Sequence, residues 1–335
     1  MGSVNIKKLA LELNLSAATV SRALHDSYEI STETKQRVWA LAKALNYQPN
    51  HFASNLRQQK SMTIAVIVPE VANNFFSQAI NGIEEIARLH DYHVLIYQTH
   101  ESTEKEIALI KRLLSGRVDG ILISVASNAN DSEHFKELIT QLPLVFFDRL
   151  YEDIEAITVT TDDYESAFNA TQHLVDCNCK KIAYLQALNN LSTGKKRLAG
   201  YLDALKNNGI ISDEALIIKN CDDENKNYEQ VKGLLITHKP DGIIASIEDL
   251  ALPCYYACND LNLNIPADVK IVSFSNLKTA PLLKPSLTTI TQPAFQIGKE
   301  AATILFSVLN KKDIQPNETK VLKSTLMIRE STGMG

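Results

Sequence analysis

Apolar positions in the first 48 residues recur at helical spacing. Three apolar stripes share this spacing: Leu9 with Leu13, Val20 with Leu24, and Val38 with Leu41, Ala42 and Leu45. Ser16 and Ser31 stand where the second and third helices would need N-caps, and Asn14 separates the first two. The pattern predicts helix, short turn, helix, loop, helix over residues 4–48, and no strand pattern precedes residue 63.

Residues 49–61 form a polar connector. Pro49 ends the preceding helix, and Phe52, Ala53 and Leu56 are its apolar positions. The segment could be a plain linker or a helix that forms only when a partner orders it. We therefore expect an all-α head at 1–48, a connector at 49–61 and a core at 62–335.

Beyond Thr63, short apolar or β-branched runs alternate with amphipathic helical stretches. The runs are Ile64–Val68, Val94–Tyr97, Gly120–Ser124, Leu144–Phe147, Lys181–Leu185, Gly242–Ala245 and Lys270–Phe274. This alternation predicts an α/β core with parallel sheets that carry helices on both faces. The units are too many for one small sheet, so two doubly wound lobes are expected, with ligands at the carboxyl ends of the strands.

The charge is distributed unevenly along the chain. The net charge is −5, but residues 1–60 hold eight Lys/Arg and four acids, a balance of +4, and the remainder carries −9. A basic end on an acidic body is expected of a tethered DNA-binding module, although terminal segments can also be charged by chance.

Several classes of protein are disfavoured. The five cysteines match no zinc framework, and neither a signal peptide nor an 18-residue apolar run is present, so we expect a cytoplasmic protein. No phosphate-binding glycine loop, nucleophile elbow or H-E-x-x-H motif occurs, so we expect neither an enzyme nor a cofactor. We interpret His90 and His93 as surface or packing residues rather than metal ligands.

The strongest positive signal is LSAATVSRALH, Leu15–His25. A helix starting at Ala17 would place small residues in its first turn, which permits close approach to a DNA groove. Thr19 and Ser21 carry hydroxyls that suit phosphate oxygens, and Arg22 could bind a guanine edge, worth about 1–3 kcal/mol of discrimination. The alternative is an ordinary capped helix.

The chain resembles the lactose-repressor (LacI/GalR) family of bacterial transcription regulators along essentially its whole length. The segments that carry the resemblance are Ile6–His25, Ile30–Asn50 with the connector to Leu56, Asn73–Ala87, Phe146–Arg149, Lys196–Leu205, Ile265–Phe274 and Leu287–Pro293. The resemblance implies a DNA-binding regulator, in most cases a repressor, whose operator affinity is controlled by a small molecule.

The resemblance also implies which residues contact DNA. Ala17, Ala18 and Arg22 would face base edges, and backbone contacts would come from Ser16, Thr19, Ser21, Ser31, Thr34 and Asn50. Because alanines lack hydrogen-bonding side chains, most hydrogen-bonded readout would rest on Arg22. Ala53 and Leu56 would belong to a hinge helix in the minor groove, with Leu56 as a wedge between base pairs; alternatively, Leu56 packs on the core.

For the core, the resemblance implies a periplasmic-binding-protein fold with an effector between two lobes joined by three crossovers. The N-lobe would span about 62–160 and 291–320, and the C-lobe about 161–290 and 321–330. The implied effector contacts are Phe75, Phe76, Asp148, Arg197, Glu248, Asp249, Ser275 and Gln292.

The chain departs from the family at two of these positions. The family usually has Asp at 275 and commonly Asn at 248, so no particular sugar is carried over. A sugar or sugar derivative is expected, and a nucleobase stays open because Phe75 and Phe76 could stack on it.

The resemblance leaves the assembly and two other functions to consider. The chain ends without the leucine-heptad tail of the family's tetramers, so we expect a homodimer on a near-palindromic operator, with Tyr255, Tyr256 and Leu282 as core contacts. A solute-binding protein of a transport system would explain the core but not the head. A sugar-active enzyme using Asp148 and Glu248 has no further motif in its support.

Overall fold

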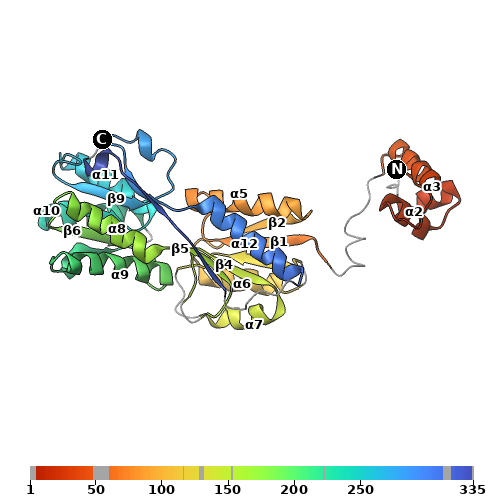
Figure 1. The fold of residues 1–335 in the computed structure, drawn as a ribbon, viewed down its shortest axis with the longest axis horizontal. Helices are drawn as coiled ribbons and strands as arrows, with labels where there is room; N and C mark the ends of the chain where they lie inside the picture. Colours follow the sequence, from red (N-terminus) through yellow and green to blue (C-terminus); the bar gives the residue numbers. More distant parts are fainter. Residues whose placement is uncertain are drawn as a thin grey trace. The chain divides into compact units, whose positions relative to one another are not determined.

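The computed structural model describes residues 5–47, 60–115, 117–127, 132–151, 154–221, 223–311 and 318–333. The chain divides into two compact units, residues 1–61 and 62–335, which we describe separately (Figure 1). The hinge predictions for Asn50, Ala53 and Leu56 lie outside the described residues. No helix in the described ranges is long and apolar enough to cross a membrane.

The head consists of the three predicted helices, α1 (Ile6–Leu13), α2 (Ala17–Leu24) and α3 (Thr32–Ala44). The predicted caps are confirmed: Ser16 accepts from the Thr19 amide, and Ser31 accepts from the Thr34 amide. The three stripes meet in one small core in which Leu9, Val20 and Val38 are fully buried. α2 therefore sits on a rigid support with its other side exposed.

The N-lobe is built on a six-stranded parallel sheet of order β11-β5-β4-β3-β1-β2. Its strands are β1 (Thr63–Val68), β2 (His93–Gln98), β3 (Gly120–Ile123), β4 (Leu144–Phe147), β5 (Thr158–Thr161) and β11 (Thr319–Leu322). Its helices are α5 (Asn74–Leu89), α6 (Thr103–Leu113), α7 (Glu133–Gln141) and α12 (Ala294–Leu309). Alternate β1 residues face opposite layers: Ile64 packs toward α5 and α12, and Ala65 toward α6 and α7.

The C-lobe repeats this arrangement with the order β12-β10-β9-β8-β6-β7. Its strands are β6 (Ile182–Gln186), β7 (Ile217–Lys219), β8 (Gly242–Ala245), β9 (Lys270–Phe274), β10 (Thr288–Thr291) and β12 (Thr325–Met327). Its helices are α8 (Asp163–Asp176), α9 (Ser192–Asn207), α10 (Glu224–Thr237) and α11 (Ala251–Asp260), with the short turns η1 (Glu214–Leu216), η2 (Glu248–Leu250), η3 (Ala280–Leu282) and η4 (Glu330–Thr332). Only β12 runs antiparallel among the described strands, at one edge. The prediction of two doubly wound, essentially parallel lobes is confirmed.

The chain crosses between the lobes three times, after β5, β10 and β11. The first two crossings begin in threonine-rich strands, TVTT at β5 and TTIT at β10, whose threonines are buried except Thr291. Asp162 ties the crossings together, because its amide donates to Leu322 O and its carboxylate accepts from the Ser324 amide at 2.7 Å. These hydrogen bonds join the first crossing to the third, so the two segments are fixed to each other where they pass between the lobes.

Two glycines allow α5 and α12 to pack closely on the N-lobe. A Cβ added to Gly298 would lie 2.0 Å from Ala79 O, and one added to Gly82 would lie 2.1 Å from Phe295 O. Neither carbonyl is a flexible side chain that could move aside. The contact therefore requires glycine at both positions.

We expect Gly298→Ala to lower the free energy of unfolding of the core by about 1–3 kcal/mol, because the helices must separate to admit a methyl group. Urea unfolding of the full chain measures the change. Gly233→Ala in α10 is the control: nothing lies within 4 Å of its added Cβ, so it should be neutral or stabilise by up to ~1 kcal/mol. Equal losses in both variants would contradict the packing argument.

Candidate functional site

The exposed face of α2 carries the side chains predicted to read DNA. Ala17, Ala18 and Arg22 are exposed on it, and Ser21 is half-buried. Ser16 Oγ lies 2.8 Å from Thr19 Oγ1 at the start of α2, and Ser31 Oγ donates to Thr34 Oγ1 at 2.9 Å at the start of α3. The four capping hydroxyls thus lie beside the amide-rich ends of two helices, a setting that favours phosphate.

Arg22 does not point freely into solvent. Its Nη1 donates to Glu29 Oε2 at 2.6 Å, and the two side chains are about half exposed. A surface pair of this kind contributes roughly 0–1 kcal/mol, which the 1–3 kcal/mol of a bidentate guanine contact exceeds. Glu29 can therefore orient Arg22 without preventing it from binding a base. Sequence reasoning did not single out Glu29.

In the core, all eight predicted effector residues line one small pocket between the lobes. They come from six separate segments of chain: the start of α5, the end of β4, α9, η2, and the ends of β9 and β10. The pocket also includes Asn73, Arg149, Leu188, Ile247, Phe274 and Asn276. Its position at the carboxyl ends of the parallel strands agrees with the rule for open α/β sheets.

The pocket closes through hydrogen bonds between the lobes. Asn74 Nδ2, on the N-lobe, donates to Glu248 Oε1 at 2.6 Å on the C-lobe. Thr193 Oγ1 donates to Asp148 O at 3.0 Å, and the Ser192 amide donates to Leu150 O. Only about 50 Å³ of open space remains. A sugar is larger than this space, and the Asn74–Glu248 bond is one of the contacts that hold the lobes together around it.

Glu248 is the most fully hydrogen-bonded acid of the pocket. Besides the Asn74 bond, its Oε2 accepts from Ser275 Oγ at 2.8 Å and from the Asn276 amide at 2.9 Å. The two departures from the family pattern are therefore in direct contact: Ser275 donates to the carboxylate that Glu248 introduces. The acid beside the end of β9 is therefore Glu248 of η2, whereas the family usually supplies it as Asp at position 275.

Both guanidiniums of the pocket are held by carboxylates. Arg197 Nε donates to Asp163 Oδ1 at 2.8 Å, its Nη1 donates to Ser246 O, and its Cζ lies 4.0 Å from the Phe274 ring centroid. Arg149 Nη1 donates to Glu101 Oε1 at 2.7 Å. Although burial opposes it, the carboxylates of Glu101 and Asp148 raise the pKa of Arg149.

The aromatic residues have little free face. Phe75 and Phe76 are 7% and 2% exposed, pack edge to face at 5.3 Å, and belong to the core beneath α5. Arg149 already covers the Phe76 ring at 5.2 Å. The sequence left open that these rings stack on a nucleobase. Because little of either ring is exposed, the structure does not favour such stacking, and the polar groups of the pocket are better placed to bind a ligand.

Asp148 lines the pocket from the N-lobe. It follows β4 with φ 63°, and it is 6% exposed. Its carboxylate has only long contacts, at 3.5 Å, with Gln292 Nε2 and Arg149 Nε. Burial raises the pKa of Asp148 to about 6, although Arg149 and Arg197 oppose the shift. The pocket thus holds a buried carboxyl group whose side-chain contacts are both long.

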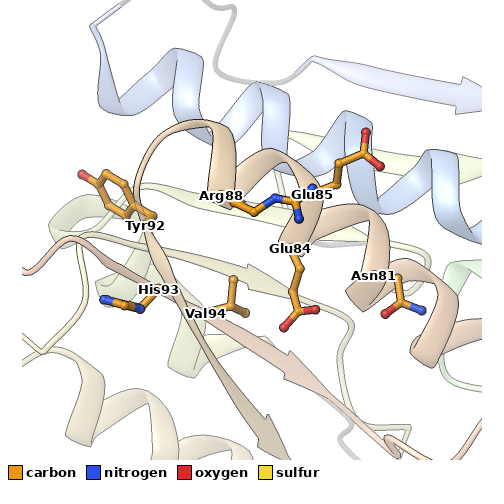
Figure 2. A pocket seen from close by; sticks show the side chains of 7 residues that line it. All are labelled: Asn81, Glu84, Glu85, Arg88, Tyr92, His93 and Val94. Atoms are coloured by element: carbon orange, nitrogen blue, oxygen red, sulfur yellow. The ribbon is translucent and has the colours of Figure 1, made fainter.

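A second hollow, of about 530 Å³, lies on the N-lobe surface between α5 and β2. Figure 2 shows its seven side chains on α5, on the turn that follows, and on the start of β2: Asn81, Glu84, Glu85, Arg88, Tyr92, His93 and Val94. Four of them, Asn81, Glu84, Arg88 and His93, are exposed. This hollow flanks an edge strand rather than the carboxyl ends of the sheet.

Comparison with known proteins decides the family. Residues 61–330 match the periplasmic binding proteins and sugar binding domain of the LacI family, and residues 5–50 match the bacterial regulatory proteins of the lacI family. The chain belongs to the LacI family. It is a DNA-binding transcription regulator with a core of the sugar-binding type.

Individual relatives span the whole chain. The HTH-type transcriptional regulator RegA of Clostridium saccharobutylicum is 31% identical over 335 residues, which cover 98% of this chain and 99% of its own. Catabolite control protein A of Staphylococcus xylosus is 32% identical over 319 residues, 94% and 95% of the two chains. The Lac repressor dimer, bound to operator and an anti-inducer, shares the fold with a TM-score of 0.87 over 99% of both chains, at 22% identity.

Sequence reasoning missed Arg149, Asn74 and Glu101. Arg149 and Asn74 lie within segments that carry the LacI resemblance, directly beside the predicted effector residues Asp148 and Phe75. This proximity in sequence could have pointed to them. Glu101 gave none, because its ion pair joins positions 48 residues apart.

We expect Asp148→Asn to stabilise the core near neutral pH by about 1–3 kcal/mol. The carboxyl titrates near pH 3.8 when unfolded and near 6 when folded, so the native state binds more protons in between. The wild-type free energy of unfolding therefore falls as pH rises through that window, and the advantage of Asn disappears by about pH 4. Urea titrations across this range measure it; a loss of stability near neutral pH would show that the carboxylate is well compensated.

We expect Glu29→Gln to raise affinity for operator and unrelated DNA alike, roughly 2- to 10-fold at low salt, because it releases Arg22 and removes a negative charge from the α2 side of the head. Fluorescence anisotropy of both DNAs gives the ratio. Glu12→Gln, at an exposed acid of α1, changes the net charge equally and is the control. The same gain in both variants would reduce the effect to net charge.

Proposed function

We propose that this LacI-family protein represses transcription from a near-palindromic operator and that a sugar-class effector bound between its lobes changes its operator affinity. The observation that carries the proposal is the convergence of eight separately placed side chains on one inter-lobe pocket, in a chain that also bears an exposed reading helix.

DNA reading rests on α2. Its Ala17 and Ala18 let the helix approach the bases closely and can contact thymine methyl groups, while Arg22 donates to guanine. The capping hydroxyls at Ser16 and Ser31, with Thr19 and Thr34, bind backbone phosphates. Asn50, Ala53 and Leu56 complete the contact in this proposal, from the connector between head and core.

The switch acts through lobe closure. An effector that bonds to residues of both lobes favours one relative arrangement of them, and the three crossovers pass that arrangement along the core. Differential binding worth about 1–3 kcal/mol would change operator affinity 5- to 150-fold. The Asn74–Glu248 bond is the contact that effector entry must break.

A homodimer supplies two reading heads for two half-sites. The N-lobe offers an apolar edge for this contact, because β2 ends its sheet and Leu95 and Ile96 are each 41% exposed. An exposed apolar edge strand requires cover. On the C-lobe, Tyr256 and Leu282 are 62% and 76% exposed, whereas the Tyr255 hydroxyl is bonded to Pro285 O.

The pocket acids serve binding in this proposal, not catalysis. Glu248 is saturated by three protein donors, so it is poorly placed to act as a general base, and the relatives named above are regulators. A transport role would leave the DNA-binding head without a purpose. A regulator that acts on bacterial DNA works in the cytoplasm, where we place this one.

Selection of a randomised palindromic library by the full chain tests the proposal, with sugars added singly. We expect one palindrome to be enriched, with an affinity that a single sugar shifts. Arg22→Ala should then cost about 1–3 kcal/mol per half-site on the selected operator while weak, salt-sensitive binding to unrelated DNA persists.

Arg37→Ala is the matched control, because it removes an exposed charge from α3 instead of α2. It should weaken operator and unrelated DNA equally. Unchanged operator affinity in Arg22→Ala would overturn the assignment of base reading to Arg22, and failure to enrich any palindrome would overturn the proposal of an operator-binding repressor.

A further inference from the structure

The inter-lobe pocket carries more negative charge than its cations balance. Three carboxylates, Asp148, Glu248 and Asp249, line it with two guanidiniums, and none of its described lining residues is Lys or His. Each guanidinium also has a carboxylate partner of its own, Asp163 or Glu101. Counting these, five carboxylates face two cations, a formal excess of three negative charges.

The excess is not shared equally among the acids. Glu248 is satisfied by three donors, as described above. Asp148 has only its two 3.5 Å side-chain contacts, and Asp249 makes no hydrogen bond or ion pair within the part of the chain that the structure describes, although Arg149 attracts its carboxylate. These two carboxylates, on opposite lobes, are the acceptors left for a ligand.

One donor is also left over. Arg149 is 8% exposed, and its Nε makes no hydrogen bond among the described residues, because the Asp148 carboxylate oxygen beside it is 3.5 Å away. A buried N–H without an acceptor is destabilising, and a ligand oxygen would remove that cost. A ligand that complements the pocket would place an acceptor oxygen beside Arg149 and hydrogen-bond donors beside Asp148 and Asp249.

An anionic ligand fits this charge pattern poorly. A carboxylate or phosphate would meet three pocket carboxylates, and both guanidiniums already hold an acid. A neutral sugar would supply donors but leave the charge excess in place. A protonated amine supplies three donors and one positive charge, which answers both deficits at once.

We infer that the effector is a small, hydroxyl-rich molecule bearing a protonated amine, of the amino-sugar class, whose ammonium group lies between Asp148 and Asp249. This inference rests on the proposed function of the pocket and specifies its ligand.

The titration of the pocket acids supports the same charge balance. Burial and then the neighbouring carboxylates Glu248 and Glu70 raise the pKa of Asp249, and burial raises that of Asp148 to about 6 against the pull of Arg149 and Arg197. Asp163, packed beneath Arg197, also has a raised pKa, from burial. A bound cation would stabilise the charged forms, so affinity for an amine should fall as pH drops below about 6.

The experiment compares matched ligands on the full-length protein by calorimetry and thermal shift near neutral pH. The probes are glucosamine, galactosamine, mannosamine and glucamine, with the corresponding neutral hexoses, sorbitol and gluconate. We expect at least one amine to bind about tenfold or more tightly than its neutral counterpart, and gluconate not to bind. Equal or tighter binding of a neutral or anionic probe would overturn the inference, as would no response to any amine at millimolar concentration.

Variants locate the ammonium group. Asp249→Asn should reduce affinity for the amine about 3- to 10-fold and leave the neutral sugar unchanged. Glu229→Gln removes an exposed acid on α10 outside the pocket and should change neither. If both substitutions reduced the affinity for the amine equally, the preference for amines would come from the overall charge of the core and not from Asp249.

The outcome can be separated from that of the proposed function. Palindrome selection without ligand reports on operator binding by the full chain, whatever the chemistry of its effector. If a palindrome is enriched and a neutral sugar shifts it, the regulator stands and the amine inference fails. If no palindrome is enriched but an amine binds, the amine inference stands and the proposal of an operator-binding repressor fails.

Discussion

The buried ion pair between Arg197 and Asp163 is the contact on which the rest of the pocket depends. Asp163 opens α8 directly after the first crossover, and Arg197 projects from α9, so the pair fixes the crossover against the C-lobe. The same guanidinium bonds Ser246 O after β8 and stacks on Phe274 at the end of β9. Removing one partner of such a pair leaves an uncompensated buried charge, at a cost of about 3–5 kcal/mol. Its role is to hold four elements in place beside the ligand.

The periodicity of the chain predicted the strands that are buried by apolar contact, and it overlooked those buried by hydrogen bonds. β1, β3 and β8 are continuous apolar runs, and each was predicted within one residue at either end. β5 and β10 read TVTT and TTIT, and their threonines are buried where the lobes meet, as at Thr161, whose hydroxyl lies between Asp163 and Gln292. Hydropathy does not register such strands, because the signal that marks them is a set of partners distant in sequence. The pocket shows the same limit: the family resemblance located its walls, but the pairs Arg149–Glu101 and Asn74–Glu248 appear only when the chain is folded.

The departures at positions 248 and 275 form one coupled change. A carboxylate supplied from position 275 would sit on β9 and belong to the C-lobe alone. Here the carboxylate comes from η2, Ser275 donates to it, and its other oxygen reaches Asn74 on the N-lobe. The acid has thereby become part of the closure between the lobes as well as of the pocket wall. Substituting either residue alone would leave a buried donor or acceptor unsatisfied, so the two positions should be considered together.

The excess of negative charge in the pocket has a consequence for switching. In the proposed switch, closure buries the Asp148 carboxylate, which opposes the closed arrangement although Arg149 and Arg197 attract it, while the hydrogen bonds from Asn74 and Thr193 across the lobes favour closure. A ligand can shift the populations of two arrangements whose free energies differ by only a few kcal/mol. A core with fully compensated charges would be more stable and would respond less to its effector. In the proposed switch, a ligand that donates hydrogen bonds to Asp148 therefore offsets part of this burial cost when the lobes are closed.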